Sequence, residues 1–223
     1  MIKVDLITGP LGAGKTTFIS EYASVIAKEA KTAIIVNDFG AINVDRLFLE
    51  ERIGNICHLE MVIGGDADCA KRRLKTKLIA LAMDKYEHVI VEPSGIFEAG
   101  DFIDMLFEEP LDKWYRINSV IALVEAGTDF DEMSYEAKYI LASEISKAGS
   151  VLISKGEASD EMLVNARNIY RKVHRILNIV FAVSRNTHKI SSAALAFHHV
   201  RQSLLIMIRL CERSDDKCSV LYE

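Results

Sequence analysis

Eight residues near the amino terminus have the types and spacing of a phosphate-binding loop. Residues 9–16 read Gly-Pro-Leu-Gly-Ala-Gly-Lys-Thr, which fits the pattern Gly-x-x-x-x-Gly-Lys-[Ser/Thr]. Glycines let such a loop curl so that successive backbone N–H groups point at phosphate oxygens, while its lysine reaches the β- and γ-phosphates and its last hydroxyl binds Mg²⁺. The pattern predicts a nucleoside triphosphate site. The residues expected to hold the phosphates and Mg²⁺ are Gly9, Gly12, Ala13, Gly14, Lys15 and Thr16.

An apolar stretch that ends in an acid gives a second signal. Residues 88–92 read His-Val-Ile-Val-Glu and are followed by Pro93, Ser94 and Gly95. A strand here would place the Glu92 carboxylate at the sheet edge, where it can hold Mg²⁺ directly or through water. Gly95 could bring a backbone N–H close to the γ-phosphate. The alternative is a plain strand followed by a proline-containing turn.

A third signal is the stretch Asn-Asp-Phe-Gly at residues 37–40, with Asp45 further on. An acid just past a strand can join the Mg²⁺ shell or order a switch loop, which makes Asp38 a candidate. Lys15, Asp38 and Glu92 are thus the candidate catalytic residues. The alternative for Asp38 is an Asx-type turn closed by Gly40.

A fourth signal concerns the nucleobase. Residues 151–157 read Val-Leu-Ile-Ser-Lys-Gly-Glu, and GTP-binding proteins commonly end a strand with Asn-Lys-x-Asp, whose acid accepts hydrogen bonds from guanine. Here Ser154 replaces Asn and Glu157 replaces Asp, while Lys155 is kept. We expect these three residues to bind the base with a preference for guanine, although ATP stays open. The alternative is a charged loop after a strand.

Strand-like and helix-like segments alternate along the chain. Apolar, β-rich runs occupy residues 3–8, 32–36, 88–92, 119–124, 150–154 and 178–182. Helical patterns occupy residues 15–28, 69–83, 97–106, 131–147, 160–177 and 191–211. This alternation predicts an α/β fold with a mostly parallel sheet and helices on both faces, whose ligands bind at the carboxyl ends of the strands. Residues 38–66 look irregular, as functional or mobile insertions often do.

Length and composition exclude several classes of protein. The chain has 223 residues, half of them hydrophobic, and a net charge of −5, which argues against nucleic acid as an electrostatic partner. No secretory signal precedes the phosphate loop, and the apolar stretch 193–210 is interrupted by polar residues, so it is a poor membrane span. The chain has four cysteines, which are too few for a fold held together by disulfides. We expect a cytoplasmic protein.

Taken together, the four motifs resemble those of the CobW-like GTPases over roughly residues 2–185. That family belongs to a group of metal-delivery GTPases that also contains HypB and UreG. The resemblance implies a P-loop NTPase domain that binds GTP and Mg²⁺, in a family linked to zinc homeostasis or to supplying metal to enzymes and cofactors. It also implies that Thr17 helps to hold the phosphates. Asp38 and Glu92 would serve Mg²⁺ and the switch region, and Lys155 and Glu157 would serve the base.

The chain departs from the family at its metal motif. The family hallmark is Cys-x-Cys-Cys, whereas residues 64–69 read Gly-Gly-Asp-Ala-Asp-Cys. Carboxylates are harder ligands than thiolates, so a site of Asp66, Asp68 and Cys69 would bind Zn²⁺, Co²⁺ or Fe²⁺ less tightly than three thiolates. Cys57 and His58 could contribute if the loop folds back. Alternatively, Asp66 or Asp68 caps a helix that begins near Cys69, worth ~1 kcal/mol, and Cys69 is a small buried hydrophobe.

The remainder of the chain is expected to be accessory. We assign residues 1–185 to the GTPase domain and residues 186–223 to a C-terminal helix and short tail packed on it, so that the family's usual C-terminal domain is reduced or absent. A basic run on the helix at 69–83 is read as a solvated face or a docking site for an acidic partner. An apolar stripe is read as core or, if exposed, as a homodimer contact; it comprises Leu195, Val200, Leu204, Ile208 and Cys211.

The sequence leaves two classes of function open. In the first, a slowly hydrolysing GTPase moves residues 38–69 when the γ-phosphate is lost, as in other switch proteins, and delivers metal to a client metalloprotein or assists cofactor assembly. In the second, a metal-free regulatory GTPase or ATPase activates a partner enzyme. A nucleotide kinase is disfavoured by the motifs at the strand ends.

Overall fold

A six-stranded sheet forms the centre of the molecule. The computed structural model describes residues 1–38, 44–63, 67–93, 99–125, 128 and 132–154. The strands are β1 (Ile2–Thr8), β2 (Thr32–Asp38), β3 (His58–Ile63), β4 (His88–Glu92), β5 (Tyr115–Glu125) and β6 (Ser150–Ser154). Their order is β3-β2-β4-β1-β5-β6 and every pairing is parallel. All six strands therefore end at the same edge, which we call the carboxyl edge, and begin at the opposite, amino edge.

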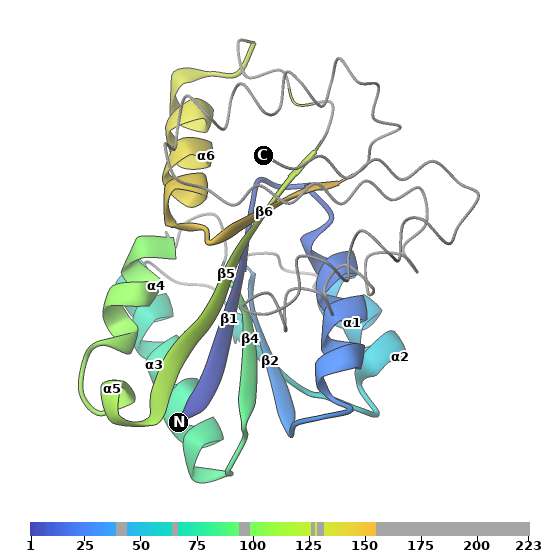
Figure 1. The fold of residues 1–223 in the computed structure, drawn as a ribbon, viewed down its shortest axis with the longest axis vertical. Helices are drawn as coiled ribbons and strands as arrows, with labels where there is room; N and C mark the ends of the chain where they lie inside the picture. Colours follow the sequence, from blue (N-terminus) through green and yellow to red (C-terminus); the bar gives the residue numbers. More distant parts are fainter. Residues whose placement is uncertain (39–43, 64–66, 94–98, 126–127, 129–131, 155–223) are drawn as a thin grey trace, which may run out of the picture.

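Helices cover both faces of this sheet (Figure 1). They are α1 (Lys15–Ile26), α2 (Val44–Ile53), α3 (Ala67–Met83), α4 (Ala99–Leu106), α5 (Leu111–Trp114) and α6 (Tyr135–Lys147). Helices α1 and α2 lie on one face, and the four later helices lie on the other (Figure 1). This two-faced cover explains why the central strands are continuously apolar.

The core is divided by the sheet into two layers, and alternate residues of each strand serve each layer. All five residues of β4 are buried; Val89 and Val91 pack in the layer under α3 and α4, whereas Ile90 packs in the layer under α1. Phe18 and Tyr22 of α1 stack at 5.4 Å between ring centroids in that second layer. Period-two alternation of this kind fixes the register of each strand.

The predicted α/β fold is confirmed, and five of the six predicted strands are present with small shifts at their ends. The interpretation of residues 38–66 as irregular was wrong, because α2 and β3 lie within that stretch. Helix α2 buries Leu49 and Ile53, one turn apart, against the α1 layer. Strand β3 is an edge strand on which His58 and Glu60 alternate with buried or half-buried apolar residues, so it lacks a continuous apolar run.

The predicted strand at 178–182, the predicted helices at 160–177 and 191–211, and the division at residue 185 lie outside the described residues. Within the described part of the chain, no helix has both the length and the apolar character needed to cross a bilayer.

Candidate functional site

The phosphate loop connects the end of β1 to the start of α1, as predicted. Three of its glycines have positive φ, with values of 137° at Gly9, 80° at Gly12 and 85° at Gly14. Gly14 is the left-handed residue directly before α1, and its carbonyl accepts the Phe18 N–H at 3.0 Å. The glycine spacing read from the sequence therefore supplies the conformations that this turn requires.

Two of these glycines serve different purposes. A Cβ at Gly9 would lie 2.2 Å from the carbonyl oxygen of Leu123, because the loop packs directly on β5. A Cβ at Gly14 would meet no atom within 4 Å. Gly9 is thus required by close packing, whereas Gly14 leaves open space in front of the amino end of α1, where an anion is stabilised by the helix dipole.

Lys15 folds back across the loop. Its Nζ donates hydrogen bonds to the carbonyl oxygens of Gly9 at 2.9 Å and Pro10 at 3.1 Å, and it lies 3.8 Å from Oε1 of Glu92. Glu92 ends β4 and is only 7% exposed. The structure therefore brings the predicted lysine and the predicted acid together at the carboxyl edge, although they are 77 positions apart in the chain.

Ser154 has a role in the loop that the sequence did not indicate. It ends β6, and its hydroxyl donates to the carbonyl oxygen of Ala13 at 2.7 Å. The sequence motif predicts that Ser154 binds the base, whereas in this structure its hydroxyl contacts the phosphate loop. The other two members of that motif, Lys155 and Glu157, lie outside the described residues, as does Gly95.

A further contact holds the end of β1. The Thr8 hydroxyl donates to Oε1 of Glu144 on α6 at 2.9 Å, which ties the strand before the loop to that helix. No local sequence signal links residues 136 positions apart, so sequence reasoning missed Glu144. Thr16 and Thr17 are half-buried in the first turn of α1, and Asp38 ends β2 at the same edge.

The candidate transition-metal segment begins beside this site. In the parallel pairing of β2 and β3, Asp38 is the register partner of Ile63, so the chain leaves β3 about 5 Å from the end of β2. Asp66 lies outside the described residues. Asp68 is exposed in the first turn of α3, one residue after its start, so it is not the residue that precedes and caps the helix.

Cys69 is half-buried and Arg72 donates to its Sγ from 3.7 Å. Among the described residues, no three His, Cys, Asp or Glu side chains are grouped so that they could hold a metal ion. The prediction that Cys57 and His58 could act as further metal ligands is wrong. They lie at the amino edge, and the length of β3 separates them from Cys69. Cys57 instead packs in the core, where burial raises the pKa of its thiol to about 11.

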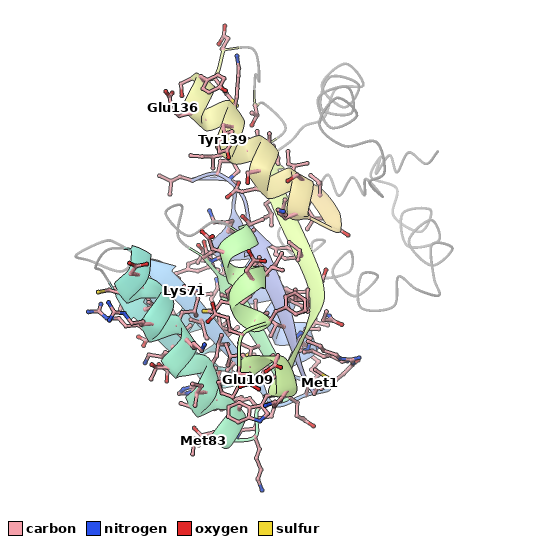
Figure 2. All side chains as sticks on the ribbon, turned by 90° about the vertical axis from the view of Figure 1, so that its left-hand side faces the viewer. Met1, Lys71, Met83, Glu109, Glu136 and Tyr139 are labelled. Atoms are coloured by element: carbon pink, nitrogen blue, oxygen red, sulfur yellow. The ribbon has the colours of Figure 1, made fainter. Side chains whose placement is uncertain are left out.

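The basic residues of α3 are paired within the molecule. Lys71 and Lys75 both contact the Glu108 carboxylate at 2.8 Å, and their hydrogen bonds lower its pKa to about 2. Lys77 pairs with Glu60, which also accepts from His58 at 2.8 Å. Burial raises the pKa of Glu60, but these hydrogen bonds outweigh it and the net shift is downward. Three of the five basic residues at positions 71–77 are therefore held in ion pairs, and Figure 2 labels the first of them, Lys71.

Comparisons with known proteins identify the family and the fold of the chain. Residues 3–181 match the family model described as CobW/HypB/UreG, nucleotide-binding domain. The chain is 29% identical over 183 residues to the zinc chaperone YjiA of Escherichia coli strain K12, a match that covers 78% of this chain and 54% of that protein. The chain spans about half the length of the curated relatives it matches.

Two solved structures show the same fold. The Zn(II)-bound YjiA GTPase from E. coli superposes with a TM-score of 0.53 at 27% identity, over 84% of this chain and 58% of that one. HypB from Helicobacter pylori in complex with nickel superposes with a TM-score of 0.58 at 16% identity, over 97% and 92% of the two chains. The second likeness concerns the fold alone.

Proposed function

The chain belongs to the CobW/HypB/UreG family of nucleotide-binding domains, and from this premise we propose that it is a GTPase whose nucleotide state controls a bound metal ion. The observation that supports nucleotide binding most strongly is the position of Lys15. Its ammonium lies between two loop carbonyls and the buried Glu92 carboxylate, where an incoming triphosphate would compete with those contacts.

The loop fits a triphosphate and Mg²⁺. Open space at Gly14 faces the amino end of α1, and the glycine conformations suit a chain of inward N–H groups. Thr16, Asp38 and Glu92 would supply oxygen ligands for Mg²⁺, which this ion prefers. When bound, Mg²⁺ would neutralise charge on the β- and γ-phosphates. Lys15 would stabilise the same charge, and Gly95 would offer an N–H to the γ-phosphate.

The base would be guanine, held by Lys155 and Glu157. Family membership supports guanine, and the altered Ser154-Lys155-Gly156-Glu157 motif is the reason to measure it. We propose that hydrolysis is slow without a partner. A partner that supplies an arginine can accelerate such reactions by ~10³ to 10⁵.

Coupling to metal follows from the order of the elements. Residues 38–69 leave the carboxyl edge at the end of β2, return to it at the end of β3, and continue into Asp66, Asp68 and Cys69. A change at the γ-phosphate therefore acts on both ends of one segment. We propose that this segment carries Zn²⁺ or a similar ion as cargo for a client metalloprotein, and that GTP and GDP favour different states of the segment.

A metal-free regulatory NTPase is the second candidate, and one observation favours it. The first turns of α3 carry Lys71, Arg72 and Arg73, and the Arg72 guanidinium contacts Cys69 itself. Positive charge beside a lone thiol opposes the binding of a divalent cation. In this alternative, the nucleotide state would be read by a partner enzyme.

A Co²⁺ titration of the reduced full chain separates the two candidates. We expect stoichiometric binding with a thiolate charge-transfer band, an affinity that differs between a non-hydrolysable GTP analogue and GDP, and loss of the band in Cys69→Ala. The matched control is Cys57→Ala, which removes a thiol at the amino edge and should keep the band. Absence of specific binding with either nucleotide would contradict metal handling and leave the regulatory NTPase.

A further inference from the structure

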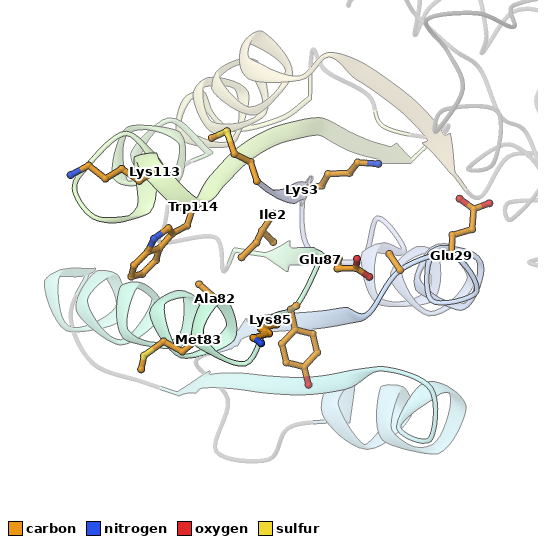
Figure 3. A pocket seen from close by; sticks show the side chains of 12 residues that line it. Ile2, Lys3, Glu29, Ala82, Met83, Lys85, Glu87, Lys113 and Trp114 are labelled. Atoms are coloured by element: carbon orange, nitrogen blue, oxygen red, sulfur yellow. The ribbon is translucent and has the colours of Figure 1, made fainter.

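The amino edge of the sheet, opposite the phosphate loop, contains a hollow that the proposed nucleotide function does not use. Its volume is ≈ 910 Å³, which is within the range of about 300–1,000 Å³ that is usual for ligand sites. Four segments surround it, namely the start of β1, the turn after α1, the turn between α3 and β4, and the end of α5 (Figure 3). We call it the amino-edge hollow.

One side of the amino-edge hollow is apolar. Trp114 and Met83 lie on that side, with Ile2 next to them (Figure 3). Met83 is 73% exposed and Trp114 is 37% exposed. Large apolar side chains that gather on a surface mark interaction sites more often than single exposed ones, and tryptophan is enriched among the residues that dominate binding energy.

The charged residues of the whole lining are three lysines and two glutamates, namely Lys3, Lys85, Lys113, Glu29 and Glu87. Lys3 and Lys85 line the hollow, and among the described residues no carboxylate lies within ion-pair distance of either ammonium. The carboxylate of Glu87, also in the lining, accepts the backbone N–H of Lys31 at 3.0 Å. Two lysines without an acidic partner are notable in a chain whose net charge is −5.

Lys85, which lines the hollow, has an unfavourable backbone conformation. Its φ is 59°, and it is the one non-glycine residue with positive φ in the described part of the chain. Such a conformation is strained for a residue with a Cβ, and glycine is the usual choice at this position after a helix. The neighbouring turn is fixed by Lys31, whose Nζ donates to the Asp84 carbonyl oxygen at 2.7 Å and lies 4.2 Å from the Tyr86 ring centroid.

We propose that the amino-edge hollow docks a partner protein through an acidic segment that carries an aromatic or aliphatic side chain. The apolar side chain would pack between Trp114 and Met83, and the neighbouring carboxylate would pair with Lys3 and Lys85. Glu29 and Glu87 on the same lining disfavour a polyanion such as nucleic acid. The proposal is independent of the nucleotide function, since no residue of the phosphate loop contributes to it.

Selection from a random-peptide phage library on the full chain tests this docking site. We expect enriched peptides in which an acidic residue lies next to an aromatic or aliphatic one. Trp114 is the only tryptophan of the chain, so bound peptides should change its fluorescence directly. Failure to enrich such sequences, or binding that leaves Trp114 fluorescence unchanged, would overturn the proposal.

Two variants and a control sharpen the test. Lys85→Gly removes the ammonium and relieves the backbone strain, so it should fold, and Lys3→Glu reverses the charge of the second lysine. Each substitution should lower the affinity for the selected peptides by about tenfold or more, as expected when an interface charge loses its partner. Lys147→Glu, at the far end of α6, should leave binding unchanged. Equal binding to all three variants would contradict docking at this hollow.

Discussion

The two edges of the sheet present opposite ways of building a site. At the carboxyl edge the site is made largely of backbone, with three glycines at positive φ and Lys15 bonded to loop carbonyls. Toward the amino edge, around the middle of β1, the polar groups are side chains from distant segments. Asp5 of β1 is fully buried and accepts hydrogen bonds from Tyr22 at 2.6 Å, from His88 at 2.6 Å and from Asn118 at 2.7 Å.

The same strand serves both edges, because β1 runs from Lys3 in the amino-edge hollow to Thr8 at the phosphate loop. A backbone site needs particular residues close together in the chain, so it can be recognised in a sequence. A side-chain site draws on residues that only the fold brings together. The following variants test whether the two edges also behave independently in binding and in stability.

The largest effect is expected for Lys15→Ala at the carboxyl edge. Loss of this ammonium should weaken binding of a fluorescent GTP analogue, or its hydrolysis, by about 10²-fold or more, which is the usual effect of removing a preorganised donor from a charged site. Lys28→Ala, just after α1 and exposed, is the control. A Lys15→Ala protein that binds and hydrolyses GTP normally would contradict the assignment of the nucleotide site to the carboxyl edge.

The two loop glycines should differ in their effect on folding. Gly9→Ala forces a Cβ to 2.2 Å from the Leu123 carbonyl oxygen and should lower the free energy of unfolding by about 4 kcal/mol or more. Gly14→Ala meets open space and should cost about 1–2 kcal/mol, from backbone strain alone. Urea unfolding measures both. Equal destabilisation by the two substitutions would contradict the close packing of Gly9 on β5.

In the buried cluster around Asp5, Tyr22→Phe should affect stability and leave nucleotide binding intact. Burial, and then the Asp5 carboxylate, raise the pKa of Tyr22 well above its usual value, so its hydroxyl remains a donor. Removing it should cost about 1.5–3 kcal/mol, the worth of a hydrogen bond to a charged group. Tyr139→Phe, on the exposed face of α6 (Figure 2), is the matched control. A large loss of GTP affinity in Tyr22→Phe would show that the Asp5 cluster and the nucleotide site are energetically coupled.

The smallest effect is expected for Glu108→Gln, because Glu108 pairs with the exposed or half-buried Lys71 and Lys75 of α3. Because the folded pKa of Glu108 is lowered to about 2, its ion pairs stabilise the fold above its unfolded pKa of about 4.3. That contribution is lost as the pH falls from about 4.3 to about 2. Acid unfolding followed by circular dichroism should show a small difference from the parent chain at pH 6 that disappears near pH 2. A difference that grows on acidification would contradict the pairing.

Sites made of neighbouring residues in the chain could be predicted from the sequence, whereas sites made of distant residues could not. The phosphate loop and Glu92 were predicted because glycine spacing and an acid-ended strand are local patterns. The Asp5 cluster was missed because its four members lie at positions 5, 22, 88 and 118, and none has a local signature. The predicted contribution of Cys57 was wrong because β3 was not recognised, and only that strand shows that the two thiols lie at opposite edges.

We expect the nucleotide and the metal ion to bind to one coupled system at the carboxyl edge, and thermodynamic linkage then requires that each changes the affinity of the other by the same factor. The affinity of the full chain for a non-hydrolysable GTP analogue would be measured by calorimetry at saturating Mg²⁺, with and without Zn²⁺. We expect Zn²⁺ to change this affinity by the same factor by which the analogue changes Zn²⁺ affinity, and to have no effect in Cys69→Ala. An affinity for the analogue that is identical with and without Zn²⁺ would contradict the claim.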